Sequence, residues 1–293
     1  MSLKTKAAKI FRETLTLISP ELNTRVCYRV KFHKSLDFKN PQTLSEKVLW
    51  LKINNYREDP LVNQCADKYR VREFIKKKGC SDILVPLIGV YEHPEDIPWS
   101  DLPQQFVIKL NVGCGKNIIV TDITTFDCNA AVKKLNHWMK EKQWLGYAEM
   151  QYKDVKPYFL VEKYIGSEDG TPPVDYKIYC MNGKPMAILY IEGRFSDMVH
   201  ASFFDLDWNV LGINKKKYVP IDPTCAPPKP QSLARMVEAA TVLSERFPFV
   251  RVDFYDVDGQ AMFGEMTFTP AGGFGMAEVD INGKSMGAYL TVT

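Results

Sequence analysis

The chain has 293 residues, of which 45% are hydrophobic and 25% are charged, and its formal net charge is +3. These are ordinary values for a globular protein, and the length allows one large core or two to three closely packed subdomains. A net charge this small gives no support by itself to nucleic-acid binding or to membrane binding. No apolar run approaches the roughly 18 residues that a membrane span requires, so we expect no transmembrane segment.

Seven cysteines are scattered along the chain without a CxxC pair. This pattern is typical of reduced thiols in a cytoplasmic protein rather than of a disulfide framework. The first 18 residues are basic and amphipathic, but Glu13 interrupts them and they lack a continuous apolar segment. They therefore predict a surface helix that packs on the protein rather than a signal peptide. Contact of its lysines with a membrane surface is a weaker alternative.

Helical signals come first along the chain. Thr43 and Glu46 have the spacing of a capping box and predict a helix over Leu44–Asn54. A second helix is predicted over residues 64–78, and we expect it to end at Gly79.

Strand signals then take over. Predicted strands at 105–110 and 117–121 flank a glycine-rich loop at 111–116, and a helix over 130–140 and a strand over 158–162 follow. The last part of the chain contains two hairpin signals, at Asn182-Gly183 and Asp258-Gly259. The elements expected there are strands Asp175–Met181 and 185–192, a proline-rich crossing at 220–230, a helix over 233–247, and strands 249–255 and 261–268.

The last hairpin carries the clearest chemistry. Side chains alternate along a strand, so Arg251 and Asp253 share one face, and Glu265 and Thr267 share one face of the next strand. Magnesium prefers oxygen ligands and is commonly held by one or two carboxylates together with substrate phosphates. Two carboxylates from neighbouring strands, with an arginine beside them, would suit such a site.

This metal site imposes a condition on the hairpin. A two-residue turn at Asp258-Gly259 would pair Asp253 with Gly264 and leave Glu265 on the wrong face, because directly opposed residues share a face. The two carboxylates meet only if the loop has an odd length, which a left-handed residue or bulge at Gly259 would provide. The alternative is a surface hairpin whose polar face contacts water.

Three further features point to phosphate binding. Lys109 lies in an otherwise apolar strand, where its burial costs free energy unless an anion meets it. Gly113 and Gly115 can expose backbone N–H groups to phosphate oxygens, although the P-loop pattern is absent. Asp175 and Lys177 share a strand face from which they can reach a phosphate. As a lone feature, the glycine-rich loop would more simply be a hairpin turn.

In chain order these segments resemble the ATP-grasp ligases. The order is the lysine strand, the glycine-rich loop, the hinge segment 161–165, the Asp175-Tyr176-Lys177 strand, and the final pattern around Arg251, Asp253 and Glu265. The N-terminal half narrows the resemblance to the TupA-like ATP-grasp family, named for teichuronopeptide synthesis, through segments 40–47, 50–52, 67–72 and 84–90. The resemblance runs from about Phe38 to the C-terminus.

The resemblance implies an α+β fold of ATP-grasp architecture. A helical N-terminal region would cover residues 1–80. Two α+β subdomains would clasp the nucleotide: 81–165, with the lysine strand and the glycine-rich loop, and 166–293, with the metal site.

The resemblance also implies a role for each site residue. Lys109 would bind the α- and β-phosphates, and the loop residues Gly113, Gly115, Lys116 and Asn117 would lie over the β- and γ-phosphates. The hinge residues Glu162, Lys163, Tyr164 and Ile165 would lie along the adenine, and Glu168 would contact the ribose. Lys177 would meet the γ-phosphate with Asp175 beside it, and Arg251 would stabilise charge at the transferring phosphoryl group or the acyl centre. Asp253 and Glu265 would ligate magnesium.

Two positions depart from the family pattern. Thr267 stands where the superfamily usually has asparagine, which puts its part in metal binding in doubt. Lys116 makes the loop more basic than is usual in the family. Its side chain either adds phosphate-binding charge or is simply exposed.

The implied activity is an ATP- and Mg²⁺-dependent ligation of a carboxylate, such as a uronic acid or glutamate, to an amine through an acyl phosphate. The family name suggests decoration of a surface polysaccharide or peptidyl polymer. A metal-dependent glycosyltransferase is the main alternative, because Asp205-Leu206-Asp207 and Asp256-Val257-Asp258 have DxD spacing. A non-catalytic protein of the same fold and a kinase acting on a hydroxyl are further alternatives. The sequence does not give the oligomeric state.

Overall fold

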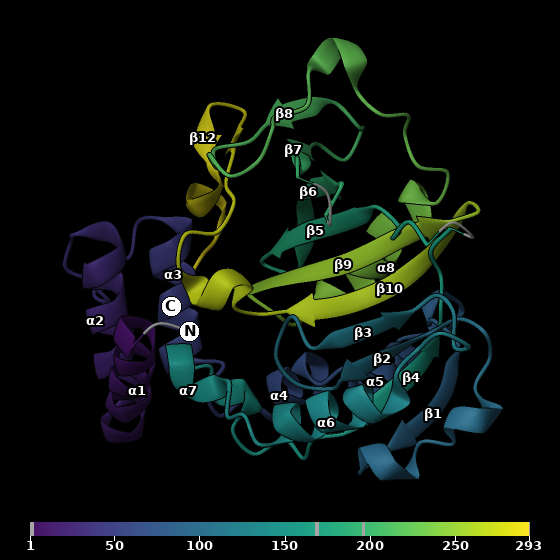
Figure 1. Ribbon diagram of the computed structural model, residues 1–293. Coiled ribbons are helices and arrows are strands. Elements are labelled where there is room, and N and C mark those ends of the chain that lie inside the picture. The colour runs from purple at the N-terminus through teal and green to yellow at the C-terminus, as the bar shows by residue number, and fades with distance from the viewer. Residues whose placement is uncertain (1–2, 168–169, 195–196, 293) are drawn as a thin grey trace.

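Two β-sheets face each other in Figure 1, with the first three helices of the chain at one side. The computed structural model describes residues 3–167, 170–194 and 197–292. The lower sheet has the strand order β1-β4-β2-β3, and the upper sheet has the order β10-β9-β5-β6-β7-β8. The predicted α+β class is therefore confirmed.

Five helices form the N-terminal part: α1 (Leu3–Ile18), α2 (Pro20–Phe32), α3 (Leu44–Asn54), α4 (Pro60–Ala66) and α5 (Val71–Lys77). The predicted bounds of α3 are confirmed, and so is its capping box. The Glu46 N–H donates to Thr43 Oγ1 over 3.2 Å, and the Thr43 N–H donates to Glu46 Oε2 over 2.9 Å. These two bonds satisfy backbone donors that the first turn of a helix leaves free.

The prediction of one continuous helix over 64–78 is wrong. Asp67 has extended backbone angles and ends α4. Its buried carboxylate then accepts hydrogen bonds from the N–H groups of Tyr69 and Arg70, at 2.8 and 3.2 Å. A short aspartate side chain competes in this way with the helical backbone, which explains the break.

The lower sheet consists of β1 (Leu87–Tyr91), β2 (Phe106–Leu110), β3 (Asn117–Val120) and β4 (Phe159–Lys163). Helix α6 (Cys128–Met139) covers one face, and the short helix α7 (Trp144–Tyr147) follows it. Phe106, Ile108 and Leu110 are buried in one cluster with Ala131 and Leu135 of α6. Because side chains alternate along β2, Lys109 lies on the opposite face.

The upper sheet contains β5 (Asp175–Met181), β6 (Lys184–Glu192), β7 (His200–Phe204), β8 (Val210–Gly212), β9 (Phe249–Val257) and β10 (Gln260–Thr267). Strands β7 and β8 are additions to the predicted elements. Helix α8 (Leu233–Ser244) contacts β5, β6 and β9, and its buried Met236 and Ala240 belong to the same core as Ile178 and Val252. A separate ribbon is formed by β11 (Asp280–Ile281) and β12 (Lys284–Ser285).

Two-residue turns join the predicted hairpins of the upper sheet. Asn182 and Gly183 have φ angles of 50° and 74°, and Asp258 and Gly259 have φ angles of 52° and 76°. Two successive left-handed residues are what a tight hairpin needs to match the twist of its strands. The Asp258-Gly259 loop therefore has an even length, and the prediction of an odd loop is wrong.

Candidate functional site

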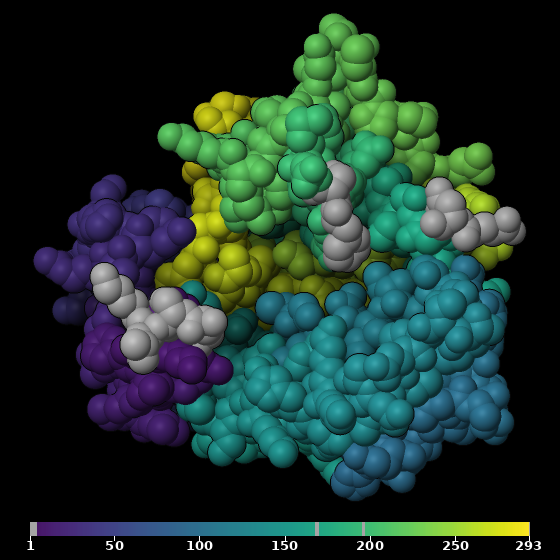
Figure 2. All heavy atoms as spheres, viewed as in Figure 1, coloured from purple at the N-terminus to yellow at the C-terminus, as the bar shows by residue number. Residues whose placement is uncertain are grey.

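A hollow lies between the two sheets and opens toward the viewer in Figure 2. The cavity in this region takes wall residues from both sheets. Seven residues that the sequence assigns to nucleotide binding line it: Lys109, Asn117, Glu162, Lys163, Tyr164, Ile165 and Asp175. Glu168, the proposed ribose partner, lies outside the described residues.

Strand pairing explains why the lower-sheet residues share one wall. Lys109 of β2 is the Cα partner of Asn117 in β3, and Val107 is the partner of both Ile119 and Glu162. Opposed residues share a face, so all five side chains point toward the cavity that they line. Lys109 Nζ lies 2.7 Å from Glu162 Oε2. The lower wall thus combines apolar surface with a lysine at one end.

The upper wall brings the two predicted metal carboxylates together. From Gln260 to Phe263, the strands β10 and β9 pair in the register that a two-residue turn sets. The register then shifts between Phe263 and Glu265, and Asp253 becomes the partner of Glu265. Gly264 is the extra residue of this bulge, and a bulge moves the residues after it to the other face. The predicted carboxylate pair forms, but inside the strand rather than at the loop.

Asp253 is held by two cations. The Arg251 guanidinium forms a bidentate pair with it: Nε donates to Oδ1 over 2.6 Å, and Nη2 donates to Oδ2 over 2.7 Å. Lys177 Nζ contacts Oδ2 as well and also lies 3.0 Å from Asp175 Oδ1. Arg194 completes this part of the network through its Nε, 2.8 Å from Asp175 Oδ2. Cations and carboxylates therefore alternate along the wall.

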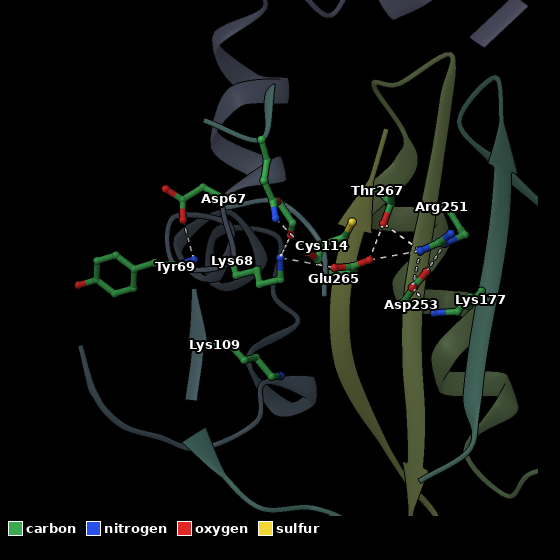
Figure 3. Close-up of polar contacts among 12 residues, drawn as sticks. Asp67, Lys68, Tyr69, Lys109, Cys114, Lys177, Arg251, Asp253, Glu265 and Thr267 are labelled. Carbon is green, nitrogen blue, oxygen red and sulfur yellow. Dashed lines mark hydrogen bonds and ion pairs between the residues drawn. The ribbon is translucent and has the colours of Figure 1, made fainter. Parts of the chain in front are cut away.

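Glu265 continues the same alternation (Figure 3). Arg251 Nη2 lies 3.3 Å from Glu265 Oε1, and Lys68 Nζ lies 3.6 Å from Oε2. The Thr267 hydroxyl donates to Glu265 Oε1 over 2.9 Å and accepts from Arg251 Nη2 over 3.1 Å. Burial alone would raise the pKa of Glu265, but Lys68, Arg251 and Lys177 together lower it to about 2. The carboxylate is therefore ionised at neutral pH.

These donors fit magnesium only as part of a shared site. Among the described residues, no cluster of three or more His, Cys, Asp and Glu side chains is placed to hold a metal alone. Asp253 and Glu265 offer two adjacent carboxylates, and magnesium commonly takes its remaining ligands from substrate phosphates and water. The residues present thus fit a metal that arrives with a nucleotide.

Three cations of the site are absent from the sequence-based assignment. Lys68 contacts Glu265, Arg72 Nη1 lies 3.2 Å from Glu162 Oε1, and Arg194 contacts Asp175. Lys68 and Arg72 both belong to segment 67–72, which carries part of the family resemblance. The resemblance of this segment could therefore have indicated Lys68 and Arg72 as site residues, whereas no sequence motif indicates Arg194.

The glycine-rich loop is connected to Glu265 through Lys68. Lys68 Nζ donates to the Gly113 carbonyl over 2.6 Å while it faces Glu265. Gly113 and Gly115 both have left-handed backbone angles, with φ of 75° and 70°. At Gly113, a Cβ atom would lie 1.7 Å from Gln143 Oε1, so a larger residue would displace the Gln143 side chain and would also be strained at this left-handed φ. Figure 3 shows Lys68 reaching from the helical part toward Glu265.

Lys116 points away from this network. Its Nζ lies 3.0 Å from Glu141 Oε2 and donates to the Trp138 carbonyl over 3.0 Å. The residue is only 7% exposed, so it is not the exposed side chain that the sequence offered as one alternative. Its polar contacts are with Trp138 near the end of α6 and with Glu141 just after it.

The DxD segments are used in turns. Asp205 accepts hydrogen bonds from the Asp207 N–H at 3.0 Å and from the Asn209 N–H at 2.7 Å. Asp256 accepts from the Gly259 N–H at 3.0 Å and from the Ser232 hydroxyl at 2.6 Å. Aspartates commonly stabilise turns through such bonds. Both segments are therefore accounted for without a nucleotide sugar.

The comparison with protein families decides the relationship. A model of the TupA-like ATPgrasp family matches residues 46–291. The chain belongs to the TupA-like ATP-grasp family. The family and the ATP-grasp architecture that the sequence predicts are thereby confirmed. In the parts of this TupA-like chain that the structure describes, each helix is too short or too polar to cross a bilayer.

Solved structures with a similar fold include three ligases. D-alanine–D-alanine ligase from Bacillus anthracis complexed with ATP has a TM-score of 0.43 and 15% identity, over 71% of this chain and 56% of that one. L-amino acid ligase from Bacillus licheniformis has a TM-score of 0.47 and 14% identity, over 82% of this chain and 52% of that one. Phosphoribosylamine–glycine ligase from Thermotoga maritima has a TM-score of 0.43 and 12% identity, over 70% of this chain and 48% of that one. This TupA-like chain thus spans about half the length of these proteins. Among curated protein sequences, none matches it.

Proposed function

We propose that this TupA-like protein is an ATP-dependent ligase that joins a carboxylate to an amine through an acyl phosphate. One observation carries the proposal. The cavity between the sheets is lined by Lys109 of the lower wall and Asp175 of the upper wall, and Asp175 belongs to the charged network that contains Asp253 and Glu265. A triphosphate needs both a cationic wall and a pair of carboxylates for its metal.

The proposed reaction has two steps. A carboxylate oxygen of the first substrate attacks the γ-phosphorus of ATP, the bond from that phosphorus to the bridging oxygen breaks, and ADP leaves. The nitrogen of the amine then attacks the acyl carbon, phosphate leaves, and the nitrogen loses a proton. The products are an amide, ADP and phosphate, and no covalent bond to the protein is needed.

The residues of the site supply positioning and charge. Lys109 binds the α- and β-phosphates, and the loop over 111–117 closes on the β- and γ-phosphates. Lys177 and Arg251 stabilise the negative charge on the transferring phosphoryl group, which is the main demand of this chemistry. Asp253 and Glu265 would hold Mg²⁺, which would neutralise phosphate charge when bound.

The adenine fits the apolar part of the cavity beside the hinge. Val107, Ile119 and Pro172 line the same cavity as the hinge residues Glu162–Ile165. Apolar walls with a few fixed polar groups are the usual surroundings of a bound base. We therefore assign the hinge segment to the adenine, and residues 81–165 and 166–293 to the two halves that clasp the nucleotide.

The substrate proposal is a uronic acid or glutamate carboxylate in a precursor of a surface polysaccharide or peptidyl polymer. It rests on the family to which the chain belongs. We place the reaction in the cytoplasm, where ATP is available.

The test is an ADP-release screen of the purified protein with Mg²⁺-ATP. Uronic acids, nucleotide-linked uronic acids and amino acids are offered as carboxylates, each with a set of amines. Release should depend on one carboxylate and be abolished by Glu265→Ala, while Glu58→Ala, at a side chain that is 83% exposed, should behave as wild type. A stable phosphorylated hydroxyl product would instead identify a kinase. Absence of both ATP binding and ADP release would show that the fold serves a non-catalytic role.

A further inference from the structure

Helix α1 presents its apolar side to the solvent. Ile10, Phe11, Leu17 and Ile18 are spaced so that they share one face, and they are 63%, 56%, 69% and 69% exposed. In an ordinary surface helix, the apolar face is the one that packs on the protein. The amphipathic helix that the sequence predicts is therefore present, but its apolar face points to the solvent instead of packing on the protein.

Polar contacts hold α1 in this orientation. Thr16 is buried, and its hydroxyl donates to the Leu145 carbonyl of α7 over 2.6 Å. The Arg12 guanidinium lies over the Tyr147 ring, 5.3 Å from its centre, and the Arg12 carbonyl accepts from Asn23 Nδ2 over 2.7 Å. Rotation of α1 to bury Ile10 and its neighbours would break these contacts with α7 and α2. The exposed apolar face is thus a property of the packed helix.

Positive charge is concentrated in the same two helices. Residues 1–34 contain eight Lys and Arg against two Glu, a net charge of +6, whereas the whole chain has +3. The remaining residues therefore carry a net charge of −3. Lys6, which is exposed, lies one turn before Ile10, and the exposed Lys31 and Lys34 lie at the end of α2 and just after it. An exposed apolar helix face within a strongly basic segment is the pattern of a helix that lies on an anionic membrane.

The two helices are separate from the part of the chain that defines the family. The family match begins at residue 46, after α2 ends at Phe32. Their exposed surface is thus not required by the ATP chemistry shared within the family. Pairing with a second copy through the same face would bring two groups of charge +6 together, and such like-charge contacts are unfavourable. An anionic lipid surface would bury the apolar face and attract the positive charge.

We propose that α1 binds an anionic membrane surface, with Ile10, Phe11, Leu17 and Ile18 in the headgroup region and the basic residues of α1 and α2 near the lipid phosphates. The contact lies in the plane of the membrane. It would hold the whole protein at the surface through the α1–α2 end. The proposal does not depend on the ligase activity, because membrane binding is measured without ATP.

The test is flotation of the full-length protein with phosphatidylcholine vesicles, prepared with or without phosphatidylglycerol. The protein should float only with the anionic vesicles, and added salt should weaken binding by screening. The double variant Ile10→Ser, Leu17→Ser should bind at least about tenfold more weakly, because two apolar side chains leave the interface. Ile88→Ser is the matched control, since Ile88 is a 40% exposed apolar residue of β1, at the other end of the molecule (Figure 1).

Circular dichroism and thermal unfolding would establish that the variants keep their fold. Absence of wild-type binding to anionic vesicles, or equal binding by the double variant, would overturn the proposal. So would sedimentation velocity that shows a wild-type dimer and a monomeric double variant, because the face would then belong to a second copy. Titration with ATP separates this result from the proposed function, since ATP binding should be the same in wild type and double variant.

Discussion

Asp253 and Glu265 are Cα partners across β9 and β10, although the turn that joins these strands would pair Asp253 with Gly264. The bulge at Gly264 creates this relationship. A Cβ atom at Gly264 would lie 3.1 Å from the Asp253 carbonyl oxygen and 3.3 Å from the Tyr255 ring. The bulge is therefore tight on the side of the residue that it positions.

Gly264→Ala should disturb the carboxylate pair. The new methyl group must displace Asp253 or Tyr255 by a few tenths of an ångström, which we expect to cost about 1–3 kcal/mol of unfolding free energy. The Kd for Mg²⁺-ATP should rise about tenfold, because metal and phosphate contacts depend on position. Gly146→Ala is the control, since a Cβ there meets nothing within 4 Å. Isothermal calorimetry that gives wild-type affinity for Gly264→Ala would show that the bulge geometry does not matter.

Lys109→Met should weaken ATP binding, and Lys116→Met should not. Lys109 lines the cavity, so its loss should raise the Kd for ATP at least about tenfold, equal to 1.4 kcal/mol. Lys116 instead contacts Glu141 and the Trp138 carbonyl, so its replacement should lower stability by about 1–3 kcal/mol and leave the Kd unchanged. Calorimetry and urea unfolding of both variants provide the measurements. The assignment of Lys109 fails if the two variants exchange these effects.

Lys68→Met should loosen the glycine-rich loop. Lys68 joins the Gly113 carbonyl to Glu265, so without it the loop loses this connection to Glu265. We expect amide hydrogen exchange in residues 113–117 to become about tenfold faster, together with a higher KM for ATP. Lys68→Arg should restore most of the protection, because arginine keeps the charge and the donors.

Lys77→Met is the control for this experiment. Lys77 is a 69% exposed lysine that pairs with Glu73 on the surface of α5. Such pairs contribute little, so neither the loop nor the KM should respond. Unchanged exchange in Lys68→Met would mean that the loop is held by its own backbone conformation.

The site shows what the sequence can and cannot predict. Alternation along strands placed Arg251 beside Asp253 and Lys177 beside Asp175, and the structure has these pairs in contact. The position of the register shift could not be read in the same way. A bulge at Gly264 and a longer loop at Gly259 both bring Asp253 opposite Glu265, and periodicity does not distinguish them.

Contacts between distant segments of the chain also could not be predicted from the sequence. Lys68 and Arg72 come from the helical part and reach carboxylates of two different sheets, Glu265 and Glu162. Such contacts depend on how the parts pack together, which local patterns do not determine. The break at Asp67 depends on the same kind of context. An aspartate in a helical pattern stops the helix only when its side chain can bond the next N–H groups, as it does here.

Glu46→Gln should lower stability in a pH-dependent way. Glu46 accepts hydrogen bonds from the Tyr28 hydroxyl at 2.6 Å, the Gln42 N–H at 2.8 Å and the Thr43 N–H at 2.9 Å. Although burial alone would raise the pKa of Glu46, these bonds lower it from its ordinary value of 4.5. A carboxyl group with a lowered pKa stabilises the fold above its unfolded value and loses that contribution as the pH falls through the folded value.

The variant should therefore be about 1 kcal/mol less stable than wild type at pH 7, because an amide oxygen accepts these bonds more weakly than a carboxylate. The difference should begin to shrink as the pH falls below the ordinary value of 4.5, and it should be lost as the pH falls through the lowered pKa of the folded wild-type carboxyl group. Urea unfolding from pH 7 down to pH 3 measures it. Glu58→Gln, at an 83% exposed side chain beside Arg57, should match wild type throughout. A Glu46→Gln deficit that stays constant over this range would mean that Glu46 joins α2 to α3 by shape alone, without its charge.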